Sequence, residues 1–222
     1  MSIENVSIPT PHCLGMKECD SAASERARVA SLGSLDLQED AADPLTIHLS
    51  HGLAYTVGSA IGQIPPSTNT CLAAFIVPNK VGLTAGARAW SKHAHRSQVE
   101  PQDEADAVEI KKKTQESAGW WGTPSGPVAS INERALVLFW RIMDGATWRN
   151  LHWLPHQILV YEARVAEGYG MRWAQDRGKK QDEEDQDVVA GVIEPPWIFR
   201  GFVEPMMENG HELGWRHSVS PT

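Results

Sequence analysis

The sequence predicts an α+β fold, a single domain in which a mixed or antiparallel sheet packs on two or more helices. Its apolar patterns run as strand, then helices, then strands, rather than as a regular βαβ alternation. The chain has 222 residues, of which 41% are hydrophobic. It is therefore long enough to bury a sizeable core.

Two segments have the periodicity of helices. Over Thr84–Arg96 the apolar residues fall on one face at helical spacing: Leu83, Ala87, Trp90 and Ala94. Ser130 and Glu133 have the spacing of a capping box before an apolar run. This second pattern predicts a helix over Ile131–Asp144 that ends at Gly145.

Four segments have the composition of strands. Apolar runs bounded by proline, glycine or polar residues predict strands over Cys71–Val77, Gln157–Val165, Gly168–Trp173 and Trp197–Val203. Glu162 stands inside the second of these, where an inward-facing carboxylate needs a basic partner such as Arg164.

The charge of the chain is unevenly distributed. Residues 1–44 hold eight acids and three bases and predict a flexible acidic tail before a single domain over 45–222. Polar insertions near 98–118 and 174–190 are also acidic. The net charge is -8, but the rest of the domain carries +3. The overall acidity therefore does not exclude an anionic ligand.

Several classes of protein are excluded or made improbable. No run of about 18 apolar residues predicts a membrane span. The absence of a signal sequence and the odd count of 3 cysteines favour a soluble cytoplasmic or nuclear protein. The sequence contains no P-loop and no GxGxxG motif. His211 and Glu212 do not begin an HExxH motif, because Trp215 stands where the second histidine belongs.

Histidine pairs raise the hypothesis of a divalent metal cofactor, because imidazole is a common metal ligand. His152 and His156 have ligand-like spacing, but Pro155 disfavours a helix there and predicts a loop. The predicted metal ligands are His152, His156 and His211. The predicted catalytic residues are His93, His95, His156 and Glu162.

A basic stripe on the predicted helix at 84–96 is the most site-like cluster, because guanidinium groups bind phosphate or carboxylate in pairs of hydrogen bonds. The sequence has 9 tryptophans, many beside a base, and an exposed one could stack on a ligand. The predicted ligand-binding residues are Arg88, Lys92, Arg96, Trp120, Trp121 and Arg172.

Three functions stay open. The first is an enzyme that acts on a small anionic molecule in a histidine- and arginine-rich pocket. The second is a binding module for a phosphate-bearing ligand or RNA, with bases for phosphate and tryptophan for stacking. The third is an interaction or scaffold protein, in which the tryptophans are structural. The sequence does not indicate the oligomeric state.

Overall fold

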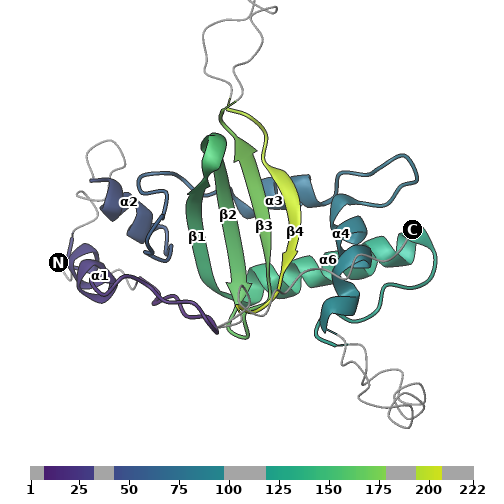
Figure 1. Ribbon diagram of the computed structural model, residues 1–222, viewed down its shortest axis with the longest axis horizontal. Helices are drawn as coiled ribbons and strands as arrows, with labels where there is room; N and C mark the ends of the chain where they lie inside the picture. The colour runs from purple at the N-terminus through teal and green to yellow at the C-terminus, as the bar shows by residue number, and fades with distance from the viewer. Residues whose placement is uncertain (1–7, 33–42, 98–118, 179–193, 207–222) are drawn as a thin grey trace, which may run out of the picture.

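Four antiparallel strands in chain order form the centre of the computed structural model (Figure 1). They are β1 (Ala146–Leu154), β2 (Ile158–Val165), β3 (Gly170–Asp176) and β4 (Ile198–Val203). The structure describes residues 8–32, 43–97, 119–178 and 194–206. The predicted α+β class is confirmed.

Helices pack on one face of this sheet: α3 (Thr68–Phe75), α4 (Ala85–His93) and α6 (Val128–Gly145). A short 3₁₀ helix, Ala94–Ser97, extends α4. Phe75 joins the layers, with ring centroids 5.1 Å from Phe139 of α6 and 4.8 Å from Phe199 of β4. The core therefore lies between the helices and one face of the sheet, and the other face is left for a site.

Gly86 allows α3 and α4 to approach each other closely. A Cβ atom at Gly86 would lie 2.0 Å from the Phe75 ring, which is much shorter than a van der Waals contact distance. The ring of Phe75 occupies the space that a side chain at this position would need.

Two predictions of local structure were wrong. Cys71–Val77 is not a strand, because Ser67 caps helix α3 by accepting a hydrogen bond from the Thr70 amide, and Cys71 and Phe75 bury the same helical face. The capping box was also misplaced. Helix α6 begins at Val128, so Ser130 lies inside the helix. The helix itself is confirmed.

Strand β1 was not predicted. Its buried residues do not alternate simply, because both Asn150 and Leu151 are buried. His152 therefore lies in a strand rather than in the predicted loop, and only Pro155–Gln157 forms the connection to β2. His156 and Gln157 turn the chain there with φ values of 65° and 58°.

The described part of the predicted acidic tail packs beside the sheet, which differs from a flexible tail. Helices α1 (Ala22–Ala30) and α2 (Pro44–Ser50) lie on the β1 side (Figure 1). Arg26 is buried, pairs with Glu18 and donates to the Leu53 carbonyl at 3.2 Å. Residues 1–7 and 33–42, insertion 98–118 and residues 179–190 of the second insertion lie outside the described residues.

Within the described ranges, no helix combines the length and the apolar character that a membrane crossing needs.

Candidate functional site

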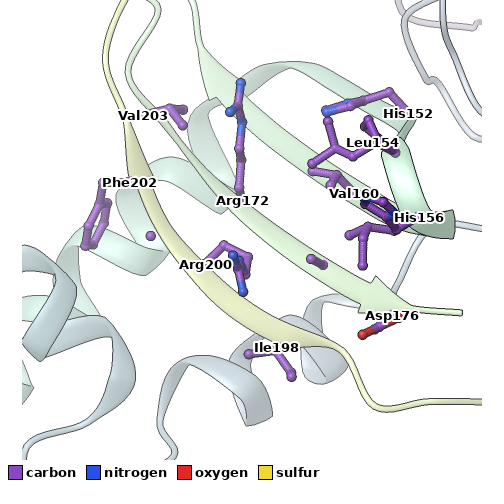
Figure 2. Close-up of a pocket in the computed structure, with 14 residues that line it drawn as sticks. His152, Leu154, His156, Val160, Arg172, Asp176, Ile198, Arg200, Phe202 and Val203 are labelled. Carbon is purple, nitrogen blue, oxygen red and sulfur yellow. The ribbon is translucent and has the colours of Figure 1, made fainter. Parts of the chain in front are cut away.

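The face of the sheet opposite α3, α4 and α6 is hollowed into a cleft of about 770 Å³ (Figure 2). All four strands contribute to its lining, together with the turn between β1 and β2. The polar side chains in this lining belong to His152, His156, Arg172, Asp176 and Arg200.

Strand alternation and register decide which side chains meet on this face. Asn150, Glu162 and Arg172 are direct neighbours across β1, β2 and β3. In the next row His152 is opposite Val160, which is opposite Ala174. The first row is polar or charged, and the second is largely apolar.

Glu162 is the centre of the charged row and is only 3% exposed. It accepts a hydrogen bond from Arg164 Nε at 2.5 Å and another from Arg172 Nε. Burial raises the pKa of the Glu162 carboxyl, but the charges of Arg164 and Arg172 outweigh burial and leave it below its ordinary value. Glu162 is therefore an ionised anchor, because both its oxygens are engaged.

Arg164 is more deeply buried than Arg172. It is 2% exposed and donates to the carbonyls of Gly168 at 2.6 Å and Glu204 at 2.7 Å. The Arg172 side chain is 43% exposed, so a ligand can reach its guanidinium group while Glu162 holds Nε. Arg172 thus combines a fixed position with access to the cleft.

A β-bulge brings a second arginine to Arg172. Phe199 is opposite Trp173 and Gly201 is opposite Arg172, so Arg200 is the extra residue in β4. Bulges of this kind redirect side chains next to functional sites. Arg200 is exposed and stands on the same side of the sheet as Arg172 in Figure 2. The two guanidinium groups can therefore face one anion.

His152 borders these arginines from β1. His152 is half-buried, and burial lowers the pKa of its imidazole. The charge of Glu162 raises this pKa and the charges of Arg172 and Arg164 lower it, so that the pKa lies below its ordinary value. His152 is thus neutral near pH 7, with one ring nitrogen able to accept a proton. The imidazole is suited to general-base chemistry.

Three predicted residues line the cleft: His152, His156 and Arg172. A fourth, Glu162, does not line it but holds Arg172 beside it. Three others lie on or beside α4. Arg88 and Lys92 are exposed there, and His95 is exposed in the following 3₁₀ helix. These three do not line the cleft. Arg96 belongs to the same 3₁₀ helix, but its side chain lies outside the described set, as does His211.

His93 lies behind β4, on the helical side of the sheet. Its Nδ1 atom is 3.7 Å from Glu204 Oε1. Its Nε2 atom is 3.9 Å from the place where Gly201 would carry a Cβ atom. His93 therefore borders the strand that carries Arg200 without lining the cleft.

Of the two predicted stacking tryptophans, Trp121 is buried and Trp120 is half-buried. Trp121 is 1% exposed. Arg141 covers one side of Trp120 at 3.9 Å, and Tyr169 stacks on it with centroids 4.5 Å apart. Both rings are already in contact with protein groups.

Arg200 and Asp176 were missed by the sequence analysis. The alternation of Ile198, Phe199 and Arg200 was a usable signal, because a buried Phe199 puts its neighbours on the opposite face. Among the described residues no group of three or more histidine, cysteine, aspartate or glutamate side chains could hold a metal ion. The metal prediction included His211, which lies outside them, and it stays a prediction.

Part of the chain is similar to a known protein family. Residues 102–180 match the family model described as the CdiA C-terminal tRNase toxin domain. The match spans α6 and strands β1 to β3, about a third of the chain, and stops before β4. Comparison with curated proteins and with solved structures gave no significant match. The part of the chain that resembles a tRNase domain is therefore the part that carries His152, Glu162 and Arg172.

Proposed function

We propose that this domain binds RNA in the cleft and cleaves it. The observation that carries the proposal is that Arg172, Arg200 and a neutral His152 line one cleft on an open sheet face. The similarity to a tRNase toxin domain supports RNA as the substrate class and favours it over a small anionic molecule.

The electrostatics of the cleft suit a phosphodiester. Arg164 and Arg172 both pair with Glu162, and Arg200 lines the same cleft as Arg172. Glu162 neutralises one positive charge and leaves an excess for an anion. Arginine binds phosphate with paired, charge-assisted hydrogen bonds. The same groups would stabilise charge that develops on the phosphoryl oxygens in the transition state.

The proposed reaction uses the 2′-hydroxyl group that distinguishes RNA from DNA. Neutral His152 removes the proton from this hydroxyl as its oxygen bonds to phosphorus. The bond from phosphorus to the 5′-oxygen breaks, and solvent in the open cleft gives that oxygen a proton. The products are a 2′,3′-cyclic phosphate and a 5′-hydroxyl end. Glu162 acts here as a positioning residue, because it fixes Arg172 and does not face the substrate.

The test uses the full chain and a labelled RNA, with binding measured at several salt concentrations and cleavage measured separately. Arg172→Ala and Arg200→Ala should each weaken binding about 10- to 150-fold, because a hydrogen bond to a charged group contributes about 1.5–3 kcal/mol. Each variant should also reduce the salt dependence of binding by about one phosphate contact.

Arg88→Ala is the matched control, because Arg88 is an exposed arginine on α4 that does not line the cleft. It should leave RNA affinity within about twofold, as surface substitutions usually do. A larger loss in Arg88→Ala than in Arg172→Ala would place the anion site on α4 and overturn the proposal. The proposal would also be overturned if the unchanged chain neither binds nor cleaves RNA.

A further inference from the structure

The cleft changes from charged to apolar along the strands. Beyond Arg172 and Arg200 its floor is formed by aliphatic side chains: Leu154, Ile158, Val160, Ala174 and Ile198. Ile198 is 54% exposed and Leu154 is 48% exposed. Exposed aliphatic side chains that line one concave surface are typical of a ligand site.

The cleft runs along β3 from Arg172 to Asp176. Arg172 and Asp176 lie on the same face of β3, four residues apart, and four residues of a strand span about 13 Å. A phosphate held at the arginine end would therefore direct its sugar and base along the aliphatic floor. Asp176 marks the far end of that floor, where it pairs with Ile158 of β2.

Asp176 is held in place at the end of β3. Its Oδ1 atom accepts a hydrogen bond from the Gly178 amide at 3.2 Å. Gly178 in turn lies against the turn between β1 and β2, because a Cβ atom there would be 2.4 Å from the His156 carbonyl oxygen. The carboxylate thus has a fixed place on the rim of the cleft.

We propose that the aliphatic half of the cleft binds one nucleobase and that Asp176 selects a base with adjacent N–H donors, which is guanine. This inference rests on the proposed function, because the arginines must hold the phosphate of the same nucleotide.

The chemistry of the four bases explains the choice. An ionised carboxylate only accepts hydrogen bonds. Guanine presents a ring N–H beside an amino group, so two donors can meet one carboxylate. Adenine and cytosine present an amino group beside an acceptor, and uracil presents one N–H between two carbonyl oxygens. In these three bases an acceptor would lie close to the negative charge of Asp176.

The experiment measures the affinity of the full chain for the 3′-monophosphates of guanosine, adenosine, cytidine and uridine, and for inorganic phosphate, by calorimetry. The guanosine nucleotide should bind about tenfold more tightly than the other three, which is within the range for a good bidentate base contact. Every nucleotide should bind more tightly than phosphate, because each base covers the aliphatic floor.

Asp176→Asn should abolish the preference for guanosine and leave phosphate affinity within about twofold, because it removes the carboxylate without changing the arginines. Asp144→Asn is the matched control, since Asp144 is an exposed aspartate on α6 outside the cleft. It should retain the preference. Ile198→Ala should weaken the binding of all four nucleotides and leave the binding of phosphate unchanged.

The outcomes separate this inference from the proposed function. If the nucleotides bind no more tightly than phosphate, or if all four bind with equal affinity, the proposed base site is overturned while the arginine site stands. A guanosine preference that persists in Asp176→Asn would remove Asp176 from the proposal. If neither phosphate nor any nucleotide binds, and Arg172→Ala changes nothing, the proposed function fails as well.

Discussion

Replacement of Glu162 by glutamine tests the charged row on which the site depends. The change keeps the size of the side chain and removes the negative charge between Arg164 and Arg172. Arg164 would then be a buried cation, 2% exposed, with only neutral acceptors: the carbonyls of Gly168 and Glu204 and the amide oxygen introduced at position 162. Removal of one partner from a buried ion pair leaves the other charge uncompensated.

The expected loss in free energy of unfolding is about 3–4 kcal/mol. Most of it comes from Arg164, near the lower end of the range of about 3–5 kcal/mol for a broken buried pair, because Arg164 keeps two carbonyl acceptors. Arg172 adds about 0–1 kcal/mol, because its side chain is 43% exposed and water screens its charge. For a chain of this length the loss corresponds to a Tm decrease of about 6–16 °C.

Chemical denaturation at neutral pH measures this loss, and Glu167→Gln is the matched control because Glu167 is an exposed glutamate in the adjoining turn. The double variant Glu162→Gln/Arg164→Met should be more stable than Glu162→Gln alone, since it removes both buried charges. A loss below about 1 kcal/mol, equal to that of the control, would refute the buried ion pair.

The pH dependence of stability gives a second measure of the same network. The pKa of Glu162 in the folded protein lies below its ordinary value of 4.5. The ion pair therefore stabilises the fold above that value and is lost as the pH falls through the lower pKa of the folded state. The stability difference between the unchanged chain and Glu162→Gln should narrow only below about pH 4.5. A difference that narrows at neutral pH would contradict this assignment.

The remaining predictions concern the proposed base, the helix contact and the metal. His152→Ala should lower kcat for RNA about 10²- to 10⁴-fold, and cleavage by the unchanged chain should rise through a pKa below 6.5, because burial keeps His152 neutral; a rate independent of His152 would contradict its role. Gly86→Ala should cost about 1–3 kcal/mol in unfolding experiments, because its Cβ would meet Phe75; unchanged stability would contradict the close contact. Cleavage should survive EDTA, because His152 accepts the proton without a metal; activity lost with EDTA and restored by a divalent ion would support the histidine metal site instead.

Parts of the site could be predicted from local sequence. Glu162 stands inside an apolar strand, so an inward-facing carboxylate there needed a basic partner such as Arg164. Local sequence left open whether it faced inward, because seven consecutive residues of the strand are buried and the pattern does not alternate. Helix α6 followed from its apolar spacing. Strand β1 could not be predicted in this way, because one of its buried residues, Asn150, is polar. Its side chain is satisfied by hydrogen bonds with Ser59 and Thr56, which local sequence does not reveal. Without β1, the place of His152 beside the arginines could not be predicted.

The sequence by itself determined the fold class and the helix that became α6. Only the tertiary structure decided which basic side chains line the cleft. The stripe containing Arg88 satisfied every local criterion, yet it lies on a helix outside the cleft. Arg172 and Arg200 lie on different strands, and the β3–β4 register with one extra residue in β4 brings both into the cleft. Side-chain periodicity is a local property, whereas register depends on how distant strands pair, and that pairing created the cleft.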